Sequence, residues 1–199
     1  MSLLVETIKV ENGIPLNVSF HNERMIRSLF GVFGLRNEPD LEKFINIPSF
    51  AFKGIYKCRI EYDSKIRKVE FLPYIIRPVR SLKLIFDDNI NYTYKYVNRD
   101  NIYRLMGMRG NCDDILIIKN GMVTDSSYAN VIFRDVNDNW ITPSSYLLRG
   151  TKRESLFKSG QISEANIAFR DIQKYSEVKL INAMLGIEDT VGIPVRNII

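Results

Sequence analysis

Long apolar runs are missing from this sequence. No stretch approaches the roughly 20 consecutive apolar residues that a membrane-spanning helix requires, so we expect no such helix. The first residues carry neither a basic segment nor a small-residue cleavage site, which argues against secretion. Internal repeats and low-complexity tracts are absent as well, which excludes a repeat architecture.

Cysteine is also scarce. The chain of 199 residues has two cysteines, Cys58 and Cys112, and they lie far apart and fit no metal-ligand spacing. Two cysteines in a chain of this length are typical of free, buried thiols in a reducing compartment. We therefore predict a cytoplasmic protein without a metal site.

A cluster of basic residues is lacking too, although the net charge is +5 and the isoelectric point is about 9.1. The densest basic run, 65–68, lies in an alternating pattern and is typical of the solvated side of a strand. A nucleic-acid-binding protein, which the charge and the ten tyrosines also suggest, would gather basic and aromatic residues on one face. We expect no nucleic-acid and no membrane partner, because a phosphate-bearing cofactor or an anionic substrate explains the charge equally well.

Alternating and helical patterns are present along the whole chain and predict a strand-dominated α+β fold in two lobes. Asn12-Gly13 and Asn120-Gly121 are hairpin turn signals. The apolar residues of 20–33 follow a helical period. Further strands are expected at 56–62, 66–74, 79–86, 92–97, 129–133, 140–142, 162–169 and 178–184, and further helices at 41–45, at 99–108 and from Gly150 onward.

The polar segment 87–91 is the expected domain boundary, because it is the most polar short connection in the middle of the chain. It predicts a small N-terminal domain, 1–86, and a larger C-terminal domain, 92–199, with 87–91 as the linker.

Lys95 is the first position where chemistry is suggested. In a strand it would share a face with Thr93 and Val97. A lysine in a partly apolar setting has a lowered pKa, and its neutral amine can attack a carbonyl to form a Schiff base. The pattern alone favours a surface lysine on an edge strand, because lysines are mostly exposed.

Three other positions suggest anion or ring binding. Asp125 precedes small hydroxyl residues and is interpreted either as a solvated turn or as the acidic partner of a pyridine nitrogen. Gly150 leads into a helix N-terminus, whose free N–H groups and dipole favour phosphate. Arg24, in a predicted helix, is either solvated or reaches a phosphate.

The order of these segments resembles the fold type IV pyridoxal-phosphate (PLP) enzymes: branched-chain and D-amino-acid aminotransferases and 4-amino-4-deoxychorismate lyase. The resemblance rests on short motifs in the same order along the chain. They are VETI at 5–8, HNERM at 21–25 (family H-x-x-R-L), YKYVNR at 94–99 (lyase L-K-H-L-N-R), VTD to NVIF at 123–133 (V-T-E-x-x-x-x-N-[LV]-F), TP at 142–143 with LRGTKR at 148–153 (L-x-G-x-x-R), and INAM at 181–184.

The resemblance implies a two-domain, D-amino-acid aminotransferase-like fold with PLP at the domain interface, and usually a homodimer. It implies that Lys95 forms the internal aldimine, that Asp125 holds the pyridinium proton and that Arg24 binds the phosphate. Its remaining phosphate-binding residues are expected to be Ser126, Ser127, Gly150, Thr151 and Lys152. The chain resembles an N-terminally short member, with Asp125 where the family usually has glutamate and Lys152 where aminotransferases often have threonine.

The predicted function is a PLP-dependent enzyme of amino-acid metabolism, most simply a transaminase with an amino-acid or keto-acid substrate. Lys95 would then form the Schiff base and shuttle the proton. Two alternatives stay open: a 4-amino-4-deoxychorismate lyase-like carbon-carbon lyase, and a non-catalytic PLP-binding relative.

Overall fold

The chain begins with a hairpin of β1 (Leu4–Glu11) and β2 (Ile14–Pro15), which turns at Asn12 and Gly13. Both turn residues have positive φ, 49° and 79°, as the predicted hairpin requires. The computed structural model describes residues 2–36 and 38–199. Contacts within it divide the chain into a smaller unit, Met1–Ile76 with Tyr94–Asn98, and a larger unit, Arg77–Thr93 with Arg99–Ile199.

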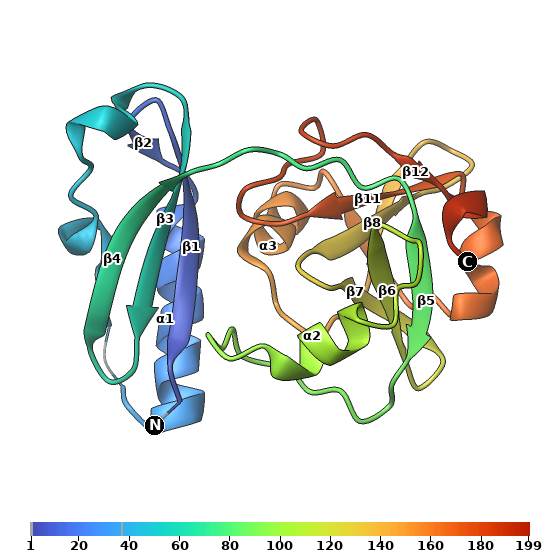
Figure 1. Ribbon diagram of the computed structural model, residues 1–199, viewed down its shortest axis with the longest axis horizontal. Helices are drawn as coiled ribbons and strands as arrows, with labels where there is room; N and C mark the ends of the chain where they lie inside the picture. Colours follow the sequence, from blue (N-terminus) through green and yellow to red (C-terminus); the bar gives the residue numbers. More distant parts are fainter. Residues whose placement is uncertain (1, 37) are drawn as a thin grey trace. The chain divides into compact units, whose positions relative to one another are not determined.

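The smaller unit is a four-stranded antiparallel sheet in the order β2-β1-β3-β4, and α1 lies along one of its faces (Figure 1). Its further elements are β3 (Ile55–Tyr62), β4 (Ile66–Pro73), α1 (Val18–Phe33) and the 3-10 turns η1 (Leu41–Phe44) and η2 (Ser49–Phe52). Leu4, Ile8 and Val10 of β1 pack with Met25 and Leu29 of α1. The predicted helix over 20–33 is confirmed, whereas 41–45 forms a short 3-10 turn.

The larger unit is an eight-stranded mixed sheet, whose path runs β10-β9-β8-β7-β6-β5 while β11 pairs with β8 and β12. Its strands are β5 (Leu82–Phe86), β6 (Asp114–Lys119), β7 (Met122–Ser126), β8 (Asn130–Arg134), β9 (Trp140–Pro143), β10 (Ser163–Ala165), β11 (Glu177–Ile181) and β12 (Ile193–Pro194). The helical elements are α2 (Asp100–Met106), α3 (Thr151–Lys158), η3 (Phe169–Lys174) and η4 (Val195–Asn197).

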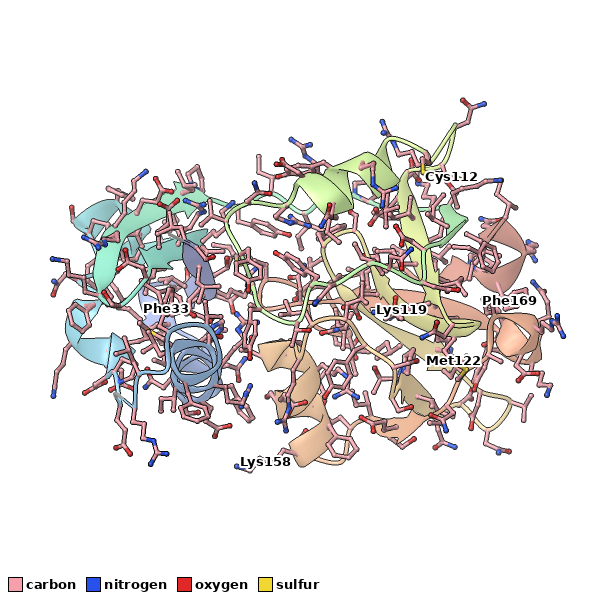
Figure 2. The ribbon with its side chains drawn as sticks, turned by 90° about the horizontal axis from the view of Figure 1, so that it is seen from below. Phe33, Cys112, Lys119, Met122, Lys158 and Phe169 are labelled. Carbon is pink, nitrogen blue, oxygen red and sulfur yellow. The ribbon has the colours of Figure 1, made fainter. Side chains whose placement is uncertain are left out.

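β6 is the most buried strand of the larger unit, since Ile115, Leu116, Ile117 and Ile118 are fully buried. Leu116 and Ile118 join the main core, and Ile115 and Ile117 pack with α2 on the other face. Burial on both faces explains the continuous apolar run in the sequence. Figure 2 marks Lys119 and Met122, which pair across the predicted β6–β7 turn.

The structure differs from the sequence predictions at the unit boundary. β5 pairs in parallel with β6 and therefore lies in the larger unit, although 79–86 was expected in the smaller one. The chain then returns, because Tyr94–Asn98 lies in the smaller unit. Strands expected at 79–86 and 162–169 are also shorter, and Phe169 lies in η3.

The strand predicted over 92–97 is wrong. An Asx turn precedes this segment, because the Asn91 side chain accepts hydrogen bonds from the backbone N–H and the hydroxyl of Thr93. Tyr96 then forms a single antiparallel bridge with Leu4. This bridge lies at the first residue of β1, so the pairing does not extend into a ladder.

Candidate functional site

Arg24 lies in the smaller unit and is held by a buried carboxylate. Its Nε and Nη2 donate to the two oxygens of Glu6, at 2.9 and 2.5 Å, and His21 Nδ1 lies 2.5 Å from Glu6 Oε2. All three side chains are buried, and Glu6 is 0% exposed. The helical period places His21 and Arg24 on the face of α1 that meets β1. Arg24 is therefore a fixed, buried cation and not a solvated helical residue.

Glu6, Arg24 and His21 differ in their protonation state at neutral pH. Burial alone raises the pKa of Glu6, but the Arg24 charge and the His21 hydrogen bond outweigh burial and lower that pKa to about 2. Burial lowers the pKa of His21, and the Arg24 and Lys95 charges lower it further, against the effect of Glu6. At neutral pH the cluster thus holds an ionised Glu6, an ionised Arg24 and a neutral His21.

Lys95 lies beside the start of β1. Its carbonyl accepts a hydrogen bond from the Val5 N–H at 2.9 Å, and the Val97 N–H donates to the Leu3 carbonyl at 2.8 Å. The side chain of Lys95 is partly buried, so it is not the exposed lysine of an edge strand. On the preceding residue, the Tyr94 hydroxyl lies against Gly31 of α1, where a Cβ would come within 1.9 Å of it. Backbone pairing and this close contact fix the position of the lysine.

Asp125 lies in the larger unit, within β7, and is 5% exposed. The interpretation of this residue as a solvated turn is therefore wrong. Its Oδ1 accepts a hydrogen bond from Asn130 Nδ2 at 2.8 Å, and its Oδ2 accepts from the backbone N–H groups of Leu147 and Leu148 at 3.2 and 2.9 Å.

Burial dominates the electrostatics of Asp125 and raises its pKa to about 6, although the three N–H donors and the Arg153 charge act in the opposite direction. A carboxylate offers about four acceptor positions, so the three donors leave about one of them for a further donor. Asp125 is thus a buried acid whose ionised form a cationic N–H donor would stabilise.

Asn130 connects Asp125 to the start of α3. Its Nδ2 also donates to the Leu148 carbonyl at 2.9 Å. Its Oδ1 lies so close to Gly150 that a Cβ on this residue would come within 1.9 Å of it. Gly150 caps α3 with φ −73°, a value open to any residue, so the close approach explains the glycine.

The first turn of α3 contains Thr151, Lys152 and Arg153, of which Thr151 and Arg153 are buried and Lys152 is partly buried. The first N–H groups of a helix have no intrahelical partner and attract anions. Arg153 donates to the Pro143 carbonyl, pairs with Glu154 and Glu164, and stacks 4.2 Å from the Tyr146 ring. Figure 2 marks Lys158 at the far end of this helix.

Ser126 and Ser127 lie at the turn between β7 and β8. The Ser126 N–H donates to the Ala129 carbonyl at 2.9 Å, and its hydroxyl accepts from the Ala129 N–H at 3.1 Å. The Ser127 carbonyl accepts a hydrogen bond from Arg99. These contacts build the turn, and the role of both serines toward a phosphate stays a prediction.

Of the eight predicted site residues, Arg24 and Lys95 lie in the smaller unit and the other six in the larger. Sequence reasoning missed Glu6, His21 and Asn130. Glu6 carried a signal: it stands between Leu4, Ile8 and Val10 on the core face of an alternating strand, where an unpaired charge is rarely found. Asn130 lies in the N-[LV]-F motif, but its partners at Leu148 and Gly150 are distant in the sequence, so its role was not predicted.

Residues 2–36 and 38–199 contain no cluster of histidine, cysteine and acidic side chains able to hold a metal ion. Over the same residues, no helix combines the length and the apolar character needed to cross a bilayer.

Comparison with known proteins gives matches along nearly the whole chain. Residues 80–197 match the family described as amino-transferase class IV. An uncharacterized protein of Haemophilus influenzae is 38% identical over 186 residues, which cover 92% of this chain and 98% of that protein. A candidate 4-amino-4-deoxychorismate lyase of Haemophilus somnus has a TM-score of 0.89 at 37% identity, covering 94% of this chain and 98% of that chain. The PLP-bound form of a hypothetical aminotransferase from Mycobacterium tuberculosis, at 18% identity, shares the fold, with a TM-score of 0.77 and coverage of 99% and 81%.

Proposed function

Because the chain belongs to the class IV aminotransferase family and has its strand-dominated α+β fold, we propose that it is a PLP-dependent enzyme acting on amino-acid-type substrates. The observation that carries this proposal is Asp125, a buried carboxylate with its pKa raised to about 6 and one acceptor position left. A protonated pyridine nitrogen is a donor of the kind this position lacks.

The other residues fit the cofactor phosphate. Arg24 offers a buried guanidinium, whose planar donors match phosphate oxygens. The N–H groups of the first turn of α3 offer further donors, and Gly150 leaves the approach to them without a side chain. We propose each of these two groups as a phosphate-binding element of its own unit, with Thr151 and Lys152 contributing from α3, while Ser126 and Ser127 shape the neighbouring turn.

Lys95 is the proposed catalytic residue. When bound, PLP supplies an aldehyde that condenses with an amine and a pyridine ring that acts as an electron sink. Lys95 Nζ would provide the amine that holds the cofactor, and the same amine, when free, would act as the base that accepts the proton of the substrate Cα. Asp125 Oδ1 would accept a hydrogen bond from the protonated ring nitrogen, whose charge makes the ring electron-withdrawing.

Transamination is the first candidate reaction, since it is the activity for which the family is named. A lyase reaction is the second candidate, and two observations favour it. The segment 94–99 is similar to the L-K-H-L-N-R motif of the lyase, and the Haemophilus somnus protein is described as a candidate 4-amino-4-deoxychorismate lyase. The homodimer and the cytoplasmic location stay predictions.

The cofactor assignment is tested with borohydride, which reduces the carbon–nitrogen double bond between a lysine and PLP to a stable single bond. Purified protein is mixed with PLP, reduced and digested, and the modified peptide is identified by mass spectrometry. We expect the label on Lys95, its loss in Lys95→Ala and its retention in Lys158→Ala, a control at an exposed lysine. A label of unchanged extent in Lys95→Ala, or protein that takes up no PLP, would overturn the assignment.

The two reactions are separated by their need for an acceptor. A transaminase turns over more than one equivalent of amino acid only when a keto acid is supplied, so L- and D-amino acids are screened in excess, with and without 2-oxoglutarate. A lyase consumes 4-amino-4-deoxychorismate with no keto acid present. Protein that binds PLP on Lys95 yet turns over none of these substrates would support the non-catalytic relative.

A further inference from the structure

Asn130, the first residue of β8, is bound on two sides and is 5% exposed. Its Nδ2 donates to Asp125 Oδ1 at 2.8 Å and to the Leu148 carbonyl at 2.9 Å. An amide NH₂ group has two donors, so these two bonds use all of them. The Leu148 N–H in turn donates to Asp125 Oδ2 at 2.9 Å. Asp125, Asn130 and the backbone of Leu148 thus form a closed ring of hydrogen bonds.

The oxygen of the same amide sets the path of the chain into α3. With both N–H groups directed at Asp125 and Leu148, the Oδ1 atom faces Gly150, where a Cβ would lie 1.9 Å away. An added methyl group cannot be accommodated at that distance unless Asn130 moves, and Asn130 cannot move without breaking its two hydrogen bonds. Gly150 is also the N-cap of α3, so the amide fixes where the free N–H groups of the helix begin.

We propose that Asn130 is a positioning residue that couples two binding elements of the larger unit: the carboxylate of Asp125 and the N-terminus of α3. The amide of Asn130 fixes both groups, so the carboxylate for the ring nitrogen and the helix N-terminus for the phosphate are positioned together. This inference rests on the proposed function, in which Asp125 meets the pyridine ring and α3 meets the phosphate. Asn130 acts through these groups and contacts no reacting atom itself.

Neither aspartate nor serine serves both elements. Aspartate has the shape of asparagine but no N–H donors, and it would place a second carboxylate beside Asp125. Serine is too short to reach both Asp125 and Leu148. The conformation of Gly150, by contrast, is open to any residue, so the close contact with Asn130, and not the backbone angle, disfavours a side chain there.

The experiment compares a ligand for the ring-binding carboxylate, a ligand for the phosphate-binding helix N-terminus, and PLP, which uses both. Equilibrium titration, followed by absorbance and by competition, gives dissociation constants for PLP, for pyridoxal, which lacks the phosphate, and for inorganic phosphate. We expect Asn130→Ser to weaken both pyridoxal and phosphate by about tenfold, the effect of losing one buried hydrogen bond on each side. Asp138→Asn, at an exposed turn residue of the same unit, is the control and is expected to leave both dissociation constants unchanged.

A second variant tests the coupling if Asn130→Ser folds poorly. Gly150→Ala is expected to displace the Asn130 amide and so to weaken pyridoxal as well as phosphate, although Gly150 lies on the phosphate side. A Gly150→Ala variant that weakens phosphate alone, or an Asn130→Ser variant with wild-type constants, would overturn the proposal. In both cases the wild type still binds PLP and the proposed function stands. If the wild type binds neither PLP nor pyridoxal, both proposals fail.

Discussion

Glu6 in the smaller unit and Asp125 in the larger are both buried carboxylates on β-strands, but their charges are stabilised differently. Glu6 meets the guanidinium of Arg24 and the ring of His21, and its pKa is lowered to about 2. Asp125 meets three neutral N–H donors, and its pKa is raised to about 6. Hydrogen bonds from neutral groups therefore do not offset the burial of Asp125, whereas a cation in contact offsets that of Glu6.

The difference shows which site is complete without a ligand. The smaller unit contains both partners of its ion pair, so Glu6 belongs to the folded structure itself. In the larger unit, no arginine or lysine of the described residues makes a hydrogen bond to Asp125 that the structure records. A ligand with a cationic N–H would supply the missing charge, which is the physical basis of the function proposed above.

The largest loss of stability is expected when the Glu6–Arg24 ion pair of the smaller unit is broken. Glu6→Gln leaves the Arg24 guanidinium buried without its charge partner, which costs about 3–5 kcal/mol of unfolding free energy. Urea denaturation of the cofactor-free protein measures the loss. Glu23→Gln, on an exposed i,i+4 pair with Arg27, is the control and should change stability by less than about 1 kcal/mol. A loss of the same size in both variants would contradict the comparison.

A second test follows the same carboxylate with pH. The folded pKa of Glu6 lies below its ordinary value of 4.5, so its stabilising effect is present above that value and is lost as the pH falls toward about 2. The difference in unfolding free energy between wild type and Glu6→Gln is therefore expected to shrink by about 3 kcal/mol over this window. A difference that stays constant between pH 4.5 and 2 would show that folding does not lower the pKa of Glu6.

The smallest of the three effects concerns the larger unit. Asp125→Asn removes the acceptor for a ring N–H and is expected to weaken PLP binding by about 2 kcal/mol, or roughly 30-fold. Asp138→Asn, at an exposed turn residue of the same unit, is the control and should leave the affinity unchanged. PLP titration measures both. Unchanged affinity in Asp125→Asn would mean that this carboxylate serves the loop at Leu147–Leu148 and not a ligand.

The pH dependence of Asp125 has the opposite sign to that of Glu6. Its folded pKa of about 6 lies above the ordinary value of 3.8, so its contribution to stability is present below pH 3.8 and is lost as the pH rises through about 6. The effect of Glu6 therefore changes mainly below pH 3.8 and that of Asp125 mainly above pH 4.5, with a short overlap between these values.

Most of the fold could be predicted from the sequence where a signal was local. The turns at Asn12-Gly13 and Asn120-Gly121 and the helix ending before Gly34 all depend on neighbouring residues and are confirmed. The segment around Lys95 could not be predicted in this way. Its alternating tyrosines favour a strand, but its partners lie at the start of β1, far away in the sequence, and they form a single bridge.

The candidate site shows the same limit. Family motifs supplied Lys95, Arg24 and Asp125 as candidates, but not the network around them. The burial of Asp125 depends on the loop at Leu147–Leu148, and the role of Asn130 depends on Gly150. These contacts join segments that are distant in the sequence, so no local pattern could have predicted them.

The return of the chain at Tyr94–Asn98 has a consequence for the order of folding. Leu3 and Val5 at the start of β1 have their backbone partners at Val97 and Lys95, so the smaller unit stays incomplete until residue 97 has been synthesised. The strands β1, β3 and β4 are available much earlier, and the last contact must close a long loop. Lys95 therefore reaches its position only after the chain has already begun the larger unit, so this lysine is among the last parts of the smaller unit to be ordered.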